Sequence, residues 1–235
     1  MSAQNPSSPS PVSDRRPHHA HWPKRLPHAI TPPQTSLWMN LAISAQRYPD
    51  KPALAFLGEV MSYAELARQA ERMAAFLHSL GVEQGDRVIL DMQNSPQLVV
   101  AHFAILRANA VVVPVNPMNR AEELKHYITD PDVKVAITTG DLAPELARAS
   151  NALPAPKRLL HLIVTQFTDA FDPGTAGDDA PPEAWSSWLQ TRHPLPALEG
   201  GQVHDWSEVL LNAHVLPEVI AGPDDLAALT FGSVM

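Results

Sequence analysis

The sequence contains no cysteine. Disulfide bonds, thiolate catalysis and cysteine-ligated zinc are therefore excluded. No apolar run reaches the roughly 18 residues that a transmembrane helix needs, so no membrane span is predicted. The N-terminus also lacks the apolar core of a secretion signal. Together these absences favour a cytoplasmic protein.

Positive charge is scarce relative to negative charge. The 17 Lys and Arg residues are outnumbered by 25 Asp and Glu residues, and the formal net charge is −8. A general nucleic-acid-binding protein needs a basic face that displaces counterions from phosphates, so the charge balance excludes that class of partner. The composition is otherwise that of an ordinary globular protein, with 45% hydrophobic residues and room for a sizeable core.

The motifs that mark common cofactor and catalytic sites are missing too. The ten glycines form neither G-x-G-x-x-G nor the Walker pattern, so neither a dinucleotide site nor a P-loop is predicted. There is no G-x-S-x-G elbow and no H-E-x-x-H metal motif. We therefore assign no catalytic residue and no metal ligand from motifs.

Residues 1–33 are rich in Pro, Ser and His. Such a segment buries too little apolar surface to offset the entropy of ordering it, so we predict a tail that is disordered over about its first 20 residues. His18, His19 and His21 form a cluster that could bind a metal ion. A solvated tail is favoured, because no carboxylate or further ligand lies at metal-binding spacing.

Residues 34–235 have the pattern of one α/β domain. Strands and helices alternate between residues 87 and 164, which indicates βαβ units and a mostly parallel sheet flanked by helices. Strands are predicted at 53–63 (two, joined at Gly58-Glu59), 87–92, 110–113, 133–139, 158–164 and 224–231. Helices are predicted at 35–48, 63–80, 95–107, 120–130, 141–150, 182–190 and 205–214. Residues 168–203 break the rhythm with Pro, Gly and Asp and are predicted to form an irregular surface insertion.

Capping residues mark the starts of two of these helices. Ser62 and Glu65 have the spacing of a capping box, in which Ser62 accepts from the Glu65 amide and the Glu65 side chain reaches back. Asn94 or Ser95 is expected to cap the helix that ends at Arg107.

A few side chains are candidates for chemistry, each with a structural alternative. Asp91 lies near the carboxyl end of a predicted strand, where open α/β sheets bind ligands, but a capping or turn-forming role is favoured. His102 and His161 are interpreted as partly buried, hydrogen-bonded histidines rather than catalytic ones. Three tryptophans are interpreted as anchors of the insertion rather than as a ligand cage: Trp185, Trp188 and Trp206.

Several stretches resemble, in the same order, the N-terminal part of the AMP-forming acyl-CoA synthetases. "RYPDKPALAF" with "MSYAELARQAERMAAFLHSLGVEQGDRVIL" resembles the first conserved block of that family. "FAILRANAVVVPVNPMNRAEELKHYITD" resembles the second, and "DDLAAL" resembles the strand that enters the phosphate-binding loop. The resemblance covers residues 36–231. It implies an incomplete N-terminal domain of an adenylate-forming enzyme, of the type that acts on fatty or related carboxylic acids.

The resemblance also implies a two-step reaction that uses ATP, Mg²⁺ and CoA. A carboxylate attacks the α-phosphate of ATP to give an acyl-adenylate and pyrophosphate, and the CoA thiol then attacks the adenylate. In the family, the adenine contacts, most of the acyl pocket and the catalytic Lys lie beyond the last residue of this chain. We therefore carry over no catalytic residue and expect the chain alone to bind none of these cofactors.

Two departures from the family pattern are informative. Asn109 stands where the family usually has Gly, at a turn that should need positive φ; Asn is the best substitute for Gly there. At the end of the chain, Ser233 aligns with the Ser of the phosphate loop, whereas Val234 and Met235 replace a Gly and a Thr. Ser233 is therefore the one candidate cofactor-binding residue, as the stub of a phosphate loop.

Two functional hypotheses follow. In the first, the chain is a truncated or split N-terminal piece of an acid–CoA ligase, inactive alone, whose partner is a missing C-terminal polypeptide. In the second, it is a self-sufficient, non-catalytic α/β module that binds a small acid or a partner protein. ATP binding and the cooperativity of unfolding distinguish them.

Overall fold

The computed structural model describes residues 17–29, 33–170, 181–211 and 213–231. The chain divides into two units, Met1–Pro33 and Gln34–Met235. In the first unit, η1 (Pro17–His21) is a 3₁₀ helix, and the Trp22 indole donates to the Pro27 carbonyl at 3.1 Å. The predicted disorder at the start of the tail concerns residues that lie largely outside the described ranges, so it stays a prediction.

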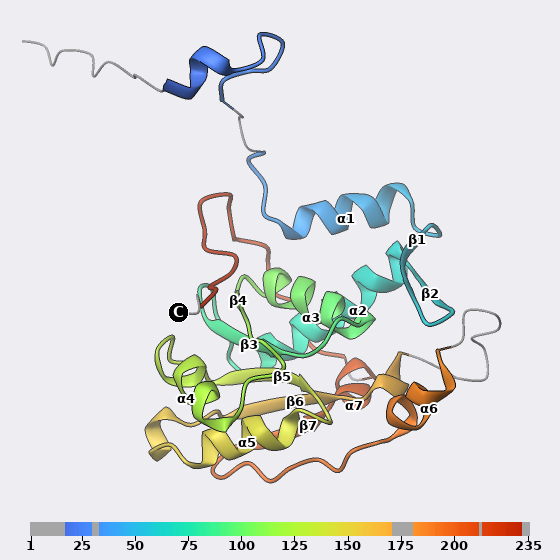
Figure 1. The fold of residues 1–235 in the computed structure, drawn as a ribbon, viewed down its shortest axis with the longest axis vertical. Coiled ribbons are helices and arrows are strands. Elements are labelled where there is room, and N and C mark those ends of the chain that lie inside the picture. The colour runs from blue at the N-terminus through green and yellow to red at the C-terminus, as the bar shows by residue number, and fades with distance from the viewer. Residues whose placement is uncertain (1–16, 30–32, 171–180, 212, 232–235) are drawn as a thin grey trace, which may run out of the picture. The chain divides into compact units, whose positions relative to one another are not determined.

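The second unit is built on a five-stranded, fully parallel sheet in the order β4-β3-β5-β6-β7 (Figure 1). The strands are β3 (Arg87–Asp91), β4 (Val111–Pro114), β5 (Val135–Thr139), β6 (His161–Thr165) and β7 (Gln202–Asp205). This confirms the predicted α/β class with a parallel sheet. The prediction missed β7, because its four residues, Gln-Val-His-Asp, carry only one aliphatic side chain.

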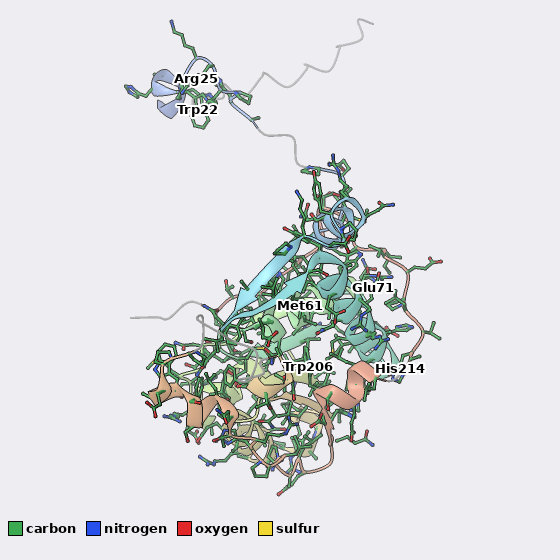
Figure 2. The ribbon with its side chains drawn as sticks, turned by 90° about the vertical axis from the view of Figure 1, so that its right-hand side faces the viewer. Trp22, Arg25, Met61, Glu71, Trp206 and His214 are labelled. Atoms are coloured by element: carbon green, nitrogen blue, oxygen red, sulfur yellow. The ribbon has the colours of Figure 1, made fainter. Side chains whose placement is uncertain are left out.

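Helices cover both faces of this sheet (Figure 1). One face packs against α2 (Tyr63–Ser79), α3 (Pro96–Arg107) and α7 (Trp206–Leu211), and the other against α4 (Ala121–Thr129) and α5 (Ala143–Asn151). The helix α1 (Trp38–Arg47) packs on α2 and α3. Val88 and Leu90 point to the first face and Ile89 to the second. Successive residues in the middle of β3 are therefore buried on both faces, which is why this strand is continuously apolar there. Figure 2 places Trp206 inside the domain, where it is 2% exposed.

A separate hairpin joins β1 (Pro52–Phe56) to β2 (Glu59–Ser62). Phe56 pairs with Glu59, so the two-residue loop is Leu57-Gly58 and lies one residue before the predicted join. Both loop residues have positive φ, 50° and 88°, as a type I′ turn requires. Glycine adopts that conformation freely, whereas leucine does so with strain.

The caps agree with the sequence in part. Ser62 accepts from the Glu65 amide at 3.2 Å, as predicted, but the Glu65 carboxylate binds Arg68 and Gln69 instead of reaching back. Ser95, rather than Asn94, caps α3 by accepting from the Leu98 amide at 3.2 Å.

The predicted last strand, 224–231, is only partly formed. The Val112 amide donates to the Ala227 carbonyl at 3.0 Å, and the Leu229 amide donates to the Val112 carbonyl at 2.9 Å. The segment therefore lies along the outer edge of β4 through a single bridge. The pairing cannot extend further in register, because Pro114 has no N–H to donate. The predicted helix 205–214 is likewise shorter, since α7 ends at Leu211.

The short helix η3 (Phe167–Asp169) begins one residue before the predicted insertion, and α6 (Glu183–Gln190) lies inside it, close to its predicted range. No helix in the described ranges is long and apolar enough to cross a membrane.

Candidate functional site

The carboxyl edge of the sheet carries a buried acidic group. Asp91 ends β3, is 3% exposed and lies in register with Thr138 of β5. Burial and the nearby Asp141 raise the pKa of Asp91 to about 7, and a hydrogen bond with Thr138 opposes that rise. The predicted capping or turn-forming role is wrong, because this side chain bonds across the sheet and Ser95 caps the next helix. Asp91 can therefore hold a proton near neutral pH.

Gln166, which follows β6, connects this edge to the insertion. Its side-chain Nε2 donates to the His193 carbonyl at 3.0 Å, and its Oε1 accepts from the His193 amide at 3.1 Å. Its own carbonyl accepts from Gln97 Nε2 at 2.9 Å, and its amide donates to Asp169 at 2.8 Å. The side chain and the backbone of this one residue thus connect α3, β6 and the segment before β7.

Gly140, just after β5, allows this arrangement. A Cβ atom at this position would lie 2.3 Å from Gln166 Oε1. Any side chain would therefore displace the Gln166 amide from His193, so the close approach requires glycine here.

Several acceptor atoms at the same edge are buried without a hydrogen-bond partner within the described ranges. They are Gln97 Oε1 and Thr139 Oγ1, on the α3 face, and Asp141 Oδ1. An unsatisfied buried acceptor typically costs about 1–3 kcal/mol, so such atoms in a native structure call for an explanation. The edge is rich in acceptors at the place where open α/β sheets bind ligands. Polar residues directly after apolar strands were the sequence signal that could have revealed Thr139 and Gln166.

Asn109 controls the path of the chain toward its last described residues. Its φ of 61° confirms the predicted left-handed turn. Its Nδ2 donates to the Glu218 carbonyl at 2.8 Å, and its Oδ1 accepts from the amides of Ile220 and Ala221 at 2.9 and 3.0 Å. Arg107 adds a bond to the Pro217 carbonyl at 2.7 Å. Asn109 is therefore more than a glycine substitute, since its side chain holds the segment that precedes the bridge to β4.

The two candidate histidines differ. His161 Nδ1 lies 3.1 Å from His204 Nε2 on the neighbouring strand, which confirms a partly buried, hydrogen-bonded residue. His102 is half-buried and its ring contacts Phe103 edge-on, but the expected hydrogen bond is not found within the described ranges. Burial lowers the pKa of both histidines.

The three tryptophans do not share one role. Trp206 is buried at the start of α7 and belongs to the main core rather than to the insertion. Trp185 and Trp188, on α6, are 55% and 39% exposed, so the interpretation of Trp185 as an anchor is wrong. Trp188 contacts Phe167, with ring centroids 4.6 Å apart.

Two predicted candidates fall outside the described residues. Ser233 is one, so its part in a phosphate loop stays a prediction. The side chain of His18 is another; of its cluster, His19 stacks on His28 with centroids 4.2 Å apart.

The geometry is that of an open parallel α/β sheet with a polar carboxyl edge, and comparison with known proteins decides the family. The sequence model of the AMP-binding enzyme family matches residues 41–233. The chain belongs to this family.

Curated relatives within it act on both fatty and aryl acids. The long-chain-fatty-acid–CoA ligase of Bacillus subtilis (strain 168) is 31% identical over 164 residues, covering 64% of this chain and 29% of the relative. The salicyl-AMP ligase/salicyl-S-ArCP synthetase of Mycobacterium tuberculosis (strain ATCC 25618 / H37Rv) is 34% identical over 179 residues, covering 68% and 28%. The chain thus spans less than a third of these relatives.

Solved structures agree on the fold of the family. The anthranilate CoA ligase AuaEII, in complex with anthranoyl-AMP, aligns with a TM-score of 0.65 at 18% identity, covering 86% of this chain and 33% of that one. Mycobacterium smegmatis MbtA, in its apo form, aligns with a TM-score of 0.60 at 25% identity, covering 95% and 34%. The parallel sheet and its helices therefore correspond to the N-terminal domain of adenylate-forming enzymes.

Proposed function

We propose that this chain supplies the N-terminal part of an AMP-forming acid–CoA ligase. In that reaction a carboxylate oxygen attacks the α-phosphorus of ATP and pyrophosphate leaves, giving an acyl-adenylate. The CoA thiol then attacks the acyl carbon, AMP leaves, and acyl-CoA forms. The observation that carries this proposal is the family match over residues 41–233, supported by relatives that are ligases of fatty and aryl acids.

The substrate class in this proposal is a fatty or related carboxylic acid. The long-chain-fatty-acid–CoA ligase is among the relatives, and the salicyl-AMP ligase extends the class to an aryl acid. None of the described residues is assigned to the acyl group. A cytoplasmic location, as the composition favours, is part of the same proposal.

Within this proposal the chain contributes scaffold rather than catalytic groups. The bridge between Val112 and Ala228 would direct the chain from the edge of β4 into a phosphate-binding loop, with Ser233 at a motif position. The loop lies outside the described residues, so we derive no step that involves ATP, Mg²⁺ or CoA. The proposed organisation is a tail, 1–33, followed by a partial domain, 34–235, that is inactive alone.

A chimera tests the ligase assignment. Residues 34–231 replace the matching segment of the Bacillus subtilis relative, and acid-dependent pyrophosphate release is measured with a panel of fatty and aryl acids. We expect release above that of the same chimera carrying Asn109→Ala, which loosens the segment before the loop. A folded chimera, verified by a cooperative melt, that released no pyrophosphate with any acid would reject the assignment.

Calorimetry on the 235-residue chain tests whether it acts alone. We expect no heat of ATP–Mg²⁺ binding at concentrations up to about 1 mM, which corresponds to a binding free energy weaker than about −4 kcal/mol. Micromolar binding would show that the chain is self-sufficient for nucleotide recognition. No ATP binding together with a sharp, cooperative unfolding transition would instead favour the non-catalytic module.

A further inference from the structure

An apolar cavity opens beside the loop that follows β3, and its lining includes neither Asp91 nor the segment 224–231. Its volume is about 310 Å³. Four parts of the chain line it: the hairpin tip, the loop before α3, η3 and α6. The lining residues are Phe56, Leu57, Gln93, Asn94, Phe167, Trp185, Trp188 and Leu189. Cavities of this size with mainly apolar walls are typical of small-molecule sites.

Aromatic side chains form one wall of the cavity. Phe167 and Leu189 are buried and form a small core of their own, against which Phe56 and Leu57 pack. Trp185 and Trp188 line the same space, yet remain substantially exposed. Two exposed indoles on one turn of α6 are unusual for residues that only anchor an insertion, because exposed aromatic surface is unfavourable in water.

Leu57, at the hairpin tip, also lines the cavity and has a strained backbone conformation. Its φ of 50° is the left-handed region, which a bulky side chain adopts only with strain. Glycine would fit this turn better, so the backbone of the hairpin does not call for leucine; the side chain instead packs against Phe167 and Leu189. Residues held in unfavourable backbone conformations cluster at ligand-binding sites.

The polar lining is confined to two amides. Gln93 and Asn94 are adjacent in the loop between β3 and α3, and none of the eight lining residues is charged. Amides donate to and accept from neutral polar groups, whereas a charged group inside an uncharged apolar cavity would lose hydration without compensation. The lining chemistry therefore selects a neutral head group.

We propose that this cavity binds an uncharged amphiphile, such as a medium-chain alcohol or primary amide. Its hydrocarbon chain would lie between Leu57 and Trp188, and its head group would bond to the amides of Gln93 and Asn94. A water-sized group occupies about 30 Å³ in the liquid, so the cavity has room for about eight to ten non-hydrogen atoms. This site is independent of the ligase assignment, whose acid substrate is negatively charged.

Tryptophan fluorescence of the full chain provides the test. The chain is titrated with 1-octanol, octanoate and octylammonium, which share one hydrocarbon length and differ in charge. We expect saturable changes with 1-octanol at a midpoint below about 1 mM, and at least tenfold weaker binding of both ions. Equal responses to all three probes, or a response that does not saturate, would overturn the proposal.

Leu57→Gly is the decisive variant. It removes an apolar side chain from the lining, and the relief of the left-handed strain offsets part of the packing that is lost against Phe167 and Leu189. We expect at least fivefold weaker 1-octanol binding by a variant that still unfolds in a cooperative thermal melt. Leu226→Gly, at an exposed leucine that does not line the cavity, is the matched control and should bind as the wild type does.

A second variant locates the signal. Trp188→Phe keeps an aromatic ring against Phe167 but removes one indole, so the fluorescence change should shrink while 1-octanol still binds by calorimetry. Unchanged 1-octanol affinity in Leu57→Gly, or an undiminished fluorescence change when Trp185 and Trp188 are both replaced with Phe, would place binding elsewhere and reject the site.

Discussion

Replacing Asn109 with glycine separates two roles that this residue has between α3 and β4. Glycine relieves the left-handed backbone, which costs a non-glycine residue about 1–2 kcal/mol and asparagine less than most. It also removes three hydrogen bonds to the segment 218–221, each with a net contribution of about 0.5–1.5 kcal/mol. The second effect is larger, so we expect Asn109→Gly to destabilise the domain by about 1–3 kcal/mol.

Urea unfolding measures this change, and hydrogen exchange locates it. The amides of Ile220 and Ala221, which donate to Asn109, should lose protection in the variant while those of the central strands keep it. Asn109→Ala should be worse than Asn109→Gly, because it loses the hydrogen bonds and keeps the strain.

Asp132→Gly is the matched control. Asp132 also has positive φ, 53°, but its side chain makes only ion pairs with Lys134 and Lys157, at about half exposure. Exposed ion pairs contribute about 0–1 kcal/mol, so this variant should be neutral or slightly stabilising. If Asn109→Gly were as stable as Asp132→Gly, the hydrogen bonds of Asn109 would contribute nothing and the reasoning would be refuted.

Four further predictions concern the sheet and the tail. Because the pKa of Asp91 is raised to about 7, the unfolded chain ionises this group first, and the folded protein loses stability as pH rises from about 4 to 7. In urea titrations, the free energy of unfolding of Asp91→Asn should therefore gain about 2–3 kcal/mol over that of the wild type between pH 5 and pH 8. A pH-independent difference would contradict the assignment. Burial lowers the pKa of His161 and His204, so the stability that their neutral pair contributes is present above about pH 6.5 and is lost below it. In thermal melts, the melting temperature of His161→Gln should therefore fall less steeply with decreasing pH than that of the wild type. An equally steep fall would show that the pair is not its cause. Gly140→Ala should destabilise the domain by about 1–3 kcal/mol in urea unfolding, because it displaces Gln166, and a neutral effect would refute this explanation. Deletion of residues 1–20 should leave the melting temperature unchanged, and a loss of several degrees would show that the tail packs.

Local signals accounted for much of what could be predicted. The alternation of apolar strands with helices indicated the parallel sheet, because strands buried on both faces need continuous apolar side chains. Ser62 as a cap and the left-handed Asn109 were predictable for the same reason, since each depends on its own residue and its near neighbours. The resemblance to the ligase family also rested on contiguous stretches of sequence.

The candidate site was less predictable, because its contacts join residues far apart in the chain. Asp91 meets Thr138 only when β3 and β5 pair, and Gln97, Gln166 and His193 meet only after the sheet has formed. Short apolar patterns carry no information on such partners. The cavity depends in the same way on the hairpin tip, which turns at Leu57, reaching α6.

The sequence by itself therefore determined the class of fold, the family and the turn at Asn109, because burial patterns, caps and left-handed residues act over a few positions. The tertiary structure alone decided that β7 completes the sheet and that residues 227–229 lie along β4. It also decided that Asp91, with a pKa raised to about 7, lies buried at the carboxyl edge of the sheet. Those features depend on which strands become neighbours and on how far water is excluded between them, and both are properties of the packed chain.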